Sequence, residues 1–366
     1  MIAAYNSLAQ AVFRTLAQSA DNIAISPLSI GVTLAMGFAA AAGETAEEMA
    51  RVLKFDAARP IVFKANADLL HHYGEGDAPE GHRLRLANAL VLTQHGESVA
   101  KSFRELLADS FAAAIFQGDI ARVNQWVAQK TEGKIEHALN SLPQDDIAVL
   151  VNAIYFKAPW AKEFNPALTH DGRFFLSEYD EVEVKMMHAV GDYATVRGAG
   201  YRAVRLPYQP PSLGMIIVLP DAFEGVDAVI GAFDTAELAR LRAALERATP
   251  DLNTFELPRF RARSEASLKT ALQQVGMALA FDWTRADFSG MTERPPAEIS
   301  VAISDLLHCA LIEVSEEGTE AAGATLKIFH IGGSSPSFIV DRPFLFFIVD
   351  ETTGAIVLQG RILDPR

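Results

Sequence analysis

The sequence predicts an α+β fold in a single domain that spans residues 1–366. Patterns typical of helices dominate the first third of the chain, and patterns typical of strands dominate it from residue 147 onward. This separation is typical of α+β proteins, whereas a doubly wound fold would alternate strands and helices. The sequence contains no internal repeat and no linker long enough to separate two domains.

Apolar residues recur at helical spacing in segments 3–18, 27–42, 44–53, 102–111, 120–139 and 236–248. The second segment follows Ser26, a favoured N-cap residue, and begins with Pro27, which suits the first helical position. Residues 22–43 carry no charge, but the helical part is shorter than the about 20 residues that span a bilayer. We therefore expect this helix to be buried in the protein core.

The remaining elements are predicted strands. After an irregular, charged stretch at 73–85, residues 86–92 predict a strand, and the uninterrupted apolar run at 148–156 predicts a strand inside a sheet. Further strands are expected at 182–187, 201–207, 215–219, 310–314, 338–340, 344–350 and 355–363. The last two are joined by residues 351–354, which predict a hairpin turn.

The composition excludes several classes of protein. The chain has 32 Lys and Arg against 46 Asp and Glu, and its formal net charge of −14 argues against a nucleic-acid partner. The single cysteine, Cys309, rules out an internal disulfide framework and a cysteine-rich metal site. The first residues lack the basic start, apolar centre and cleavage site of an export signal. We expect neither a nucleic-acid nor a membrane partner.

Enzyme motifs are absent or weak. The sequence has no nucleophile elbow and no P-loop, and residues 198–200 lack the third glycine of a dinucleotide site. His71 and His72 with Glu75 could form a metal cluster, but adjacent helical residues point to different faces, which favours a solvated helix end. We therefore expect no enzymatic activity, no metal and no cofactor.

The pattern from Gly318 to Ser337 predicts neither a helix nor a strand. Loops of this length in a compact domain are either functional or disordered. Its first half alternates small residues that could lie in a crowded sheet, and its second half, LKIFHIGGSSPS, offers accessible backbone to a protease. A flexible surface linker is the alternative interpretation.

Several motifs are spread over essentially the whole chain. They are NIAISPLSI at 22–30, VNQW at 123–126 with TEGKI at 131–135, LVNAIYFK at 150–157 followed by Trp160, EEGTEAAGAT at 316–325, and DRPFLF at 341–346. Taken together, these motifs resemble those of the serpin family. The resemblance implies the serpin fold, with about nine helices, three β-sheets and an exposed reactive-centre loop at 318–337 whose N-terminal part can join a sheet.

The resemblance also implies a function. Inhibitory serpins are suicide substrates of serine endopeptidases: the loop is cut, and it inserts into the large sheet while the protease is trapped as a covalent acyl complex. The small residues of the hinge favour an inhibitory member, and the resemblance is to the bacterial-type members of the family. A non-inhibitory serpin, serving in binding, storage or a chaperone-like role and cleaved without trapping, is the alternative.

The family pattern assigns site residues by position. The loop hinge is Gly318, Thr319, Glu320, Ala321, Ala322, Gly323, Ala324 and Thr325. The polar cluster beneath the sheet centre, the shutter, is Ser26, Ser29, Asn152 and His308, although His308 could simply be a hydrogen-bonded core histidine. The breach, where the loop enters the sheet, is Glu316, Arg259 and Trp160.

The loop register places the scissile bond at Gly332–Gly333, with cleavage after Ile331 as the second choice and after Phe329 as the third. Because glycine fills no specificity pocket, the expected targets are elastase-like, subtilisin-like or chymotrypsin-like serine proteases, or a cysteine protease. Lys327 departs from the family pattern, since it would face inward after insertion. Its ammonium could restrain insertion or escape to water along its stem, and a bulge near Leu326 could also accommodate it.

The remaining expectations concern partners and compartment. The stretch that matches the heparin-binding helix of some serpins, 63–73, carries only Lys64 as a formal cation, so heparin activation is not expected. We expect a monomer. We also expect an extracellular or periplasmic location with a signal that is not in this chain, and a cytoplasmic location stays open.

Overall fold

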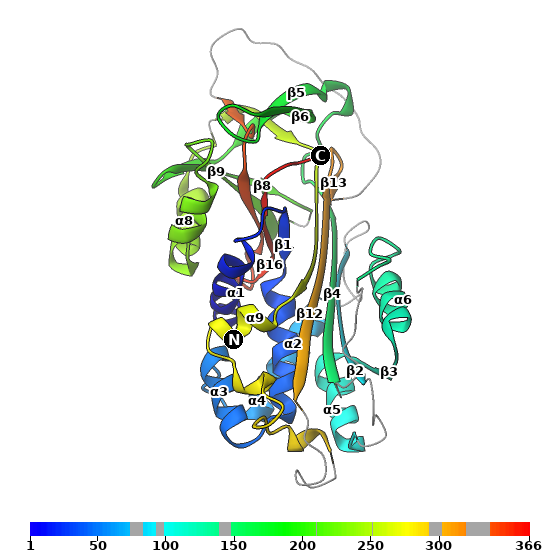
Figure 1. Ribbon diagram of the computed structural model, residues 1–366. Helices are drawn as coiled ribbons and strands as arrows, with labels where there is room; N and C mark the ends of the chain where they lie inside the picture. The colour runs from blue at the N-terminus through cyan, green and yellow to red at the C-terminus, as the bar shows by residue number, and fades with distance from the viewer. Residues whose placement is uncertain are drawn as a thin grey trace.

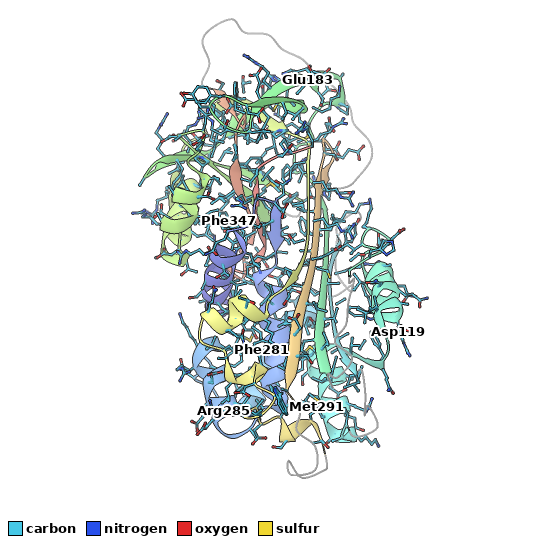
Figure 2. The ribbon with its side chains drawn as sticks, viewed as in Figure 1. Asp119, Glu183, Phe281, Arg285, Met291 and Phe347 are labelled. Atoms are coloured by element: carbon cyan, nitrogen blue, oxygen red, sulfur yellow. The ribbon has the colours of Figure 1, made fainter. Side chains whose placement is uncertain are left out.

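The computed structural model describes residues 1–73, 83–92, 99–138, 148–209, 211–250, 252–292, 302–319 and 337–366. These residues form nine α-helices and sixteen strands arranged in three β-sheets (Figure 1). The molecule is elongated, with Glu183 near one end and Met291 near the other (Figure 2). The α+β class expected from the sequence is confirmed.

The large sheet runs along the length of the molecule. Its strands lie in the order β11 (Phe260–Ser267), β12 (Ile303–Val314), β4 (Ala148–Pro159), β2 (Arg83–Leu92) and β3 (Ala114–Gln117). β12 and β4 are parallel and pair directly as far as Leu311 and Tyr155, and Figure 1 shows them side by side. We call this line of pairing the seam. At its end, β13 (Gly318–Thr319) pairs antiparallel with the last residues of β4.

Two further sheets lie against the large one. The second sheet has the order β1 (Ile23–Ile25), β16 (Ile356–Ile362), β15 (Phe344–Asp350), β9 (Leu213–Pro220), β8 (Tyr201–Pro207) and β7 (Thr195–Gly198). The third has the order β14 (Ser337–Ile339), β10 (Leu252–Pro258), β6 (Glu181–Tyr193) and β5 (His170–Phe175). The third sheet lies at the same end of the molecule as β13 (Figure 1).

The helices are α1 (Ile2–Leu16), α2 (Pro27–Ala40), α3 (Gly43–Leu53), α4 (Arg59–His72), α5 (Lys101–Phe111), α6 (Ile120–Lys130), α7 (Val226–Ala232), α8 (Thr235–Arg247) and α9 (Lys269–Gln274). Every residue of α2 is buried, as expected for the uncharged segment. Its N-cap is Ser26, whose Oγ accepts a hydrogen bond from the Ser29 amide at 3.1 Å. Among the described helices, none is long and apolar enough to cross a bilayer.

The two ends of the chain are joined. β1, near the N-terminus, pairs with β16, near the C-terminus. Gln10 Nε2 donates to Gln359 Oε1 at 2.6 Å, and the buried Arg361 donates through Nη1 to the carbonyl of Ala17 at 2.7 Å. The second sheet therefore includes strands from both ends of the sequence.

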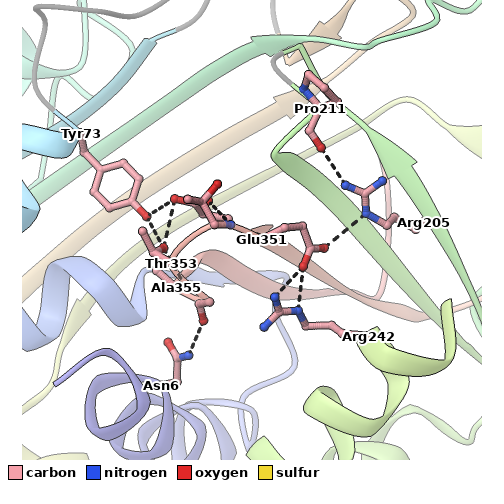
Figure 3. Close-up of polar contacts among 11 residues, drawn as sticks. Asn6, Tyr73, Arg205, Pro211, Arg242, Glu351, Thr353 and Ala355 are labelled. Atoms are coloured by element: carbon pink, nitrogen blue, oxygen red, sulfur yellow. Dashed lines mark hydrogen bonds and ion pairs between the residues drawn. The ribbon is translucent and has the colours of Figure 1, made fainter. Parts of the chain in front are cut away.

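The predicted hairpin turn at 351–354 links several elements (Figure 3). Glu351 accepts hydrogen bonds from Arg205 of β8, at 3.3 Å from Nε, and from Arg242 of α8, at 3.0 Å from Nε. Tyr73, just after α4, donates through its hydroxyl to the carboxylate of Asp350 at 2.7 Å. The turn therefore joins α4 and α8 to the second sheet.

His72, one of the residues weighed as a metal ligand, also contacts this turn, with its Nε2 3.3 Å from Asp350 Oδ2. Its neighbour His71 lies on the same last turn of α4, and Glu75 lies outside the described residues. Within the described ranges, no group of three His, Cys, Asp or Glu side chains could hold a metal ion.

Several element boundaries differ from the prediction; the strand expected at 182–187, for example, is the longer β6. The helix expected at 120–139 ends at Lys130, because Glu132 and Gly133 adopt left-handed conformations with φ of +55° and +80°. β2 begins at Arg83, inside the stretch expected to be irregular, because its pairing with β4 extends to Lys157. The strand expected at 310–314 is the end of the longer β12, whose pairing with β4 extends back to Ile303.

Candidate functional site

A buried polar cluster lies at the middle of the seam, where α2, β4 and β12 meet. It contains the four residues that the sequence assigned to the shutter, Ser26, Ser29, Asn152 and His308, and each has 0% of its surface exposed. His308 and Asn152 are partners in the β12–β4 register, and His308 Nδ1 lies 2.8 Å from Asn152 Oδ1. The amide of Ser26 donates to His308 Nε2 at 3.0 Å, and Asn152 Nδ2 donates to Ser29 Oγ. The structure thus brings all four residues into contact.

These contacts define the protonation of His308. Because Nε2 accepts a hydrogen bond from the Ser26 amide, the ring proton is assigned to Nδ1, which donates to the side-chain oxygen of Asn152. Burial lowers the pKa of His308 to about 3, so the ring is neutral near pH 7. Both ring nitrogens are engaged, which agrees with a hydrogen-bonded core histidine and equally with a bridge across the seam.

The sequence reasoning missed two members of this cluster. Asn88 of β2 accepts a hydrogen bond from Asn152 Nδ2 at 2.8 Å, and Thr33 of α2 donates to the same Asn88 oxygen, also at 2.8 Å. Both residues are buried. A polar residue within the otherwise apolar strand 86–92 was the available signal for Asn88. The cluster therefore crosses three strands of the large sheet, β12, β4 and β2.

A second cluster lies at the end of the seam and is built around Glu316. Arg259 donates from Nε to both carboxylate oxygens of Glu316 at 2.9 Å, and from Nη2 to Oε1 at 2.7 Å. Thr169 donates its hydroxyl to the same carboxylate. The side chain of Glu316 is 5% exposed, whereas that of Arg259 is 48% exposed. The predicted pairing of Glu316 with Arg259 is therefore present in the structure.

Burial raises the pKa of Glu316, but the hydrogen bonds from Arg259 and Thr169 outweigh burial and hold that pKa below its ordinary value. The carboxylate is consequently ionised near pH 7.

Trp160 connects this cluster to the start of the predicted loop. Its indole nitrogen donates to the carbonyl of Ser315 at 3.0 Å. Its ring stacks on Tyr208, with centroids 4.3 Å apart and planes inclined by 8°. The Tyr208 hydroxyl lies 3.1 Å from Thr319 Oγ1, and both residues are buried. No motif marked Tyr208 in the sequence, because a lone tyrosine after a strand has no distinctive spacing.

The first hinge residues form β13. Ser315 and Gly318 close a tight turn, with the Ser315 amide 2.9 Å from the Gly318 carbonyl, so the chain reverses after β12 and runs antiparallel to β4. Gly318 has φ of +135°, and a Cβ on it would lie 2.3 Å from the carbonyl oxygen of Ala158, so only glycine fits. Thr319 is 1% exposed.

Other predicted loop residues lie outside the described part of the chain. They are Glu320, Ala321, Ala322, Gly323, Ala324, Thr325, Leu326, Lys327, Phe329, Ile331, Gly332 and Gly333. The last residue of the predicted loop, Ser337, is the first residue of β14. The described structure therefore shows both anchors of the loop.

The arrangement suits strand addition better than catalysis. β13 has the antiparallel direction that a strand entering between β4 and β12 from this end must take. The seam ahead of it is closed by direct pairing and by the contact of His308 with Asn152. An entering strand must first separate these groups.

A family profile described as "Serpin (serine protease inhibitor)" matches residues 3–365. The leukocyte elastase inhibitor of Sus scrofa is 35% identical, over 99% of each chain. A serpin-like protein of Thermococcus kodakarensis is 32% identical, over 100% of this chain and 86% of the relative. Among solved structures, the thermophilic serpin Tengpin in its native state matches with a TM-score of 0.87 at 25% identity, over 99% of this chain and 94% of Tengpin.

We predict that Glu316→Gln lowers the stability of the protein at pH 7 by about 1–2 kcal/mol, because Arg259 loses a charge-assisted partner. A carboxylate with a depressed pKa contributes stability above its unfolded pKa and loses it as the pH falls through its folded pKa. The difference in melting temperature between wild type and Glu316→Gln should therefore shrink as the pH falls below about 4.3. Circular dichroism melts from pH 7 to pH 3 measure this, with the exposed Glu224→Gln as a control. A difference that stays constant over that range would contradict the assignment.

Proposed function

Because this chain belongs to the serpin family, whose members are non-enzymatic inhibitors or binding proteins, we propose that it inhibits serine endopeptidases as a suicide substrate. The protease cleaves the reactive-centre loop and remains attached through an ester of its serine. The N-terminal part of the loop then enters the seam as a new strand before water can hydrolyse the ester. The distorted protease stays covalently bound.

The observation that carries this proposal is the position of β13. Gly318 and Thr319 already pair with the end of β4, and they run in the direction that insertion requires. Extending this strand by about a dozen residues would add backbone hydrogen bonds on both flanks, at roughly 0.5–1.5 kcal/mol each. The gain is on the order of ten kcal/mol or more before chain entropy is counted, so the uncut protein is metastable and held by a kinetic barrier.

The side chains of the hinge support inhibition over a binding, storage or chaperone-like role. Thr319 pairs with the end of β4, has 1% of its surface exposed and contacts Tyr208. In an inserted strand, alternation would put Ala321, Gly323 and Thr325 on the same face as Thr319, and all of them are small. A sheet closing over these four positions meets no charge and no bulky side chain; the first charge on this face is that of Lys327.

The proposed target is an elastase-like, subtilisin-like or chymotrypsin-like protease, or a cysteine protease, that accepts Gly332 at the scissile bond. The name of the pig relative, leukocyte elastase inhibitor, supports the elastase-like choice. Heparin activation is not part of the proposal. Lys64 of α4 is paired with Asp68 at 2.7 Å, and Arg59 donates to the carbonyl of Ala41, so both cations of this helix are engaged.

We further propose that the protein is a bacterial-type inhibitory serpin that acts as a monomer. Its proposed location is extracellular or periplasmic, and a cytoplasmic location stays open. Relatives from an archaeon and from mammals match at similar identities. The subtype therefore rests on the sequence resemblance, and so does the location.

We predict that incubation with pancreatic elastase, subtilisin and chymotrypsin yields an adduct that survives SDS with at least one of them. The same reaction should release a C-terminal peptide that begins at Gly333. Gel electrophoresis detects the adduct, and N-terminal sequencing identifies the first residue of the peptide. Cleavage without any adduct would favour the non-inhibitory alternative, and a peptide beginning elsewhere would refute the register.

Thr319→Arg should convert the inhibitor into a substrate, because the side chain at this position is buried where the loop enters the sheet, and an unpaired guanidinium there is strongly unfavourable. The stoichiometry of inhibition should rise severalfold, and cleaved but unattached protein should accumulate. Ser337→Arg, at the exposed opposite anchor of the loop, is the matched control and should keep the wild-type stoichiometry. An unchanged stoichiometry for Thr319→Arg would contradict insertion.

Lys327→Leu tests the departure from the family pattern. If the ammonium restrains late insertion, the substitution lowers the number of inhibitor molecules consumed per protease trapped. It should also raise the melting temperature of the cleaved protein more than that of the uncut protein. Titration of active protease and paired thermal melts measure both effects. Equal melting shifts with unchanged stoichiometry would instead indicate that the amine reaches water or that a bulge near Leu326 resets the alternation.

A further inference from the structure

Three arginines from three different elements meet between the second and third sheets. Arg197 of β7 and Arg202 of β8 are direct partners in an antiparallel pair. Like charges directly opposite each other destabilise a sheet. Arg342, in the segment that follows β14, adds a third positive charge near Arg202. Such a concentration of positive charge needs a reason, because folding alone does not favour it.

The carboxylates nearby neutralise only part of this charge. Arg342 Nε lies 2.9 Å from Asp341 Oδ1, and its Nη1 donates to the backbone carbonyl of Asp221 at 2.8 Å. Arg197 Nη1 lies 3.9 Å from Asp221 Oδ1, in a pair whose arginine is 77% exposed. Two carboxylates therefore face three guanidinium groups, and the cluster keeps a net charge of about +1.

The charge without a partner is on Arg202. Its guanidinium carbon lies 4.8 Å from the ring centroid of Phe338 in β14, and within the described part of the chain it makes no hydrogen bond or ion pair. Partial burial lowers the pKa of Arg202, and the positive charge of Arg342 lowers it further. The donors of this partly buried guanidinium are therefore free to bind water or a ligand.

Aromatic rings hold two of the three guanidinium groups in place. Arg202 stacks on Phe338, and Arg342 stacks on Phe223 with its guanidinium carbon 4.5 Å from the ring centroid. Stacking fixes the plane of each guanidinium; the donors of Arg202 stay free, whereas Arg342 already donates through Nε and Nη1 and keeps Nη2 for a ligand. A planar fork held in this way suits two oxygens of a phosphate, sulfate or carboxylate group.

We propose that Arg197, Arg202 and Arg342 form a binding site for a small oxyanion, with inorganic phosphate or a phosphate monoester as the preferred ligand. A phosphate carries about two negative charges near pH 7, enough to offset the excess charge of the cluster. The site lies against Phe338 in β14, the strand that directly follows the predicted reactive-centre loop. Anion binding at this site does not depend on the proposed inhibitory mechanism.

The test is isothermal titration of the full-length protein with inorganic phosphate, at an ionic strength held constant with sodium chloride. Saturable binding is expected, and the melting temperature should rise with phosphate concentration. Arg202→Met, which keeps the length of the stem, should weaken binding about tenfold or more. The same variant should melt above the wild type when phosphate is absent, because the substitution removes the like-charge pair.

Arg173→Met is the matched control, because Arg173 also lies on a strand, stacks on a phenylalanine (Phe175) and pairs with a carboxylate (Glu181). It should leave phosphate binding unchanged. Arg197→Gln is a second variant in case Arg202→Met does not fold, and it too should weaken binding about tenfold.

Titration with glycerol phosphate distinguishes the two possible ligands, inorganic phosphate and a phosphate monoester. Tighter binding of glycerol phosphate than of inorganic phosphate assigns the site to a phosphate ester, and the reverse order assigns it to the free ion. Absence of saturable binding by either ligand would overturn the proposal. Equal binding by wild type, Arg202→Met and Arg197→Gln would also overturn it.

Discussion

The direct pairing of β12 with β4 is the contact on which the rest of the structure depends. It closes the large sheet along its centre, and α2 lies beneath it with its N-terminus at the His308–Asn152 pair. On the opposite face, α6 packs through Val123 and Val127 against an apolar cluster that includes residues of β4 and β12. Any strand that joins the sheet here must open one continuous line of backbone and side-chain hydrogen bonds.

The two polar clusters resist opening in different ways. At the middle of the seam, the groups are neutral and fully buried, so separating them leaves unsatisfied donors and acceptors in an apolar interior. At the end of the seam, Arg259 is half exposed. Water can therefore replace part of the hydrogen bonding that Glu316 and Arg259 would lose on opening. Opening is therefore easier at the end that carries β13 than at the centre, and the resistance grows as a strand advances.

Much of the fold around the seam could be predicted from the sequence, because it depends on local sequence patterns. The N-cap of α2, the apolar run of β4 and the hairpin turn after Asp350 all depend on a few neighbouring residues. The family resemblance supplied the pairs between distant residues, such as Glu316 with Arg259. Tyr208 was missed because its role comes from long-range packing that no spacing encodes, and Asn88 was missed although it is a polar residue in the otherwise apolar segment 86–92. The helix expected to reach residue 139 was wrong for a local reason, since left-handed residues at 132 and 133 end α6 early within a segment of helical pattern.

The joining of the chain ends has a consequence for the order of folding. β1 forms an edge of the second sheet only by pairing with β16, and Gln10 and Ala17 are bonded to Gln359 and Arg361. In a nascent chain, α1 and β1 are therefore made long before their partners in β16. Such contacts between residues far apart in sequence make folding slow and leave apolar surface exposed in the meantime. During that delay the seam can close before the second sheet is complete, because β4 and β12 precede β15 and β16 in the chain.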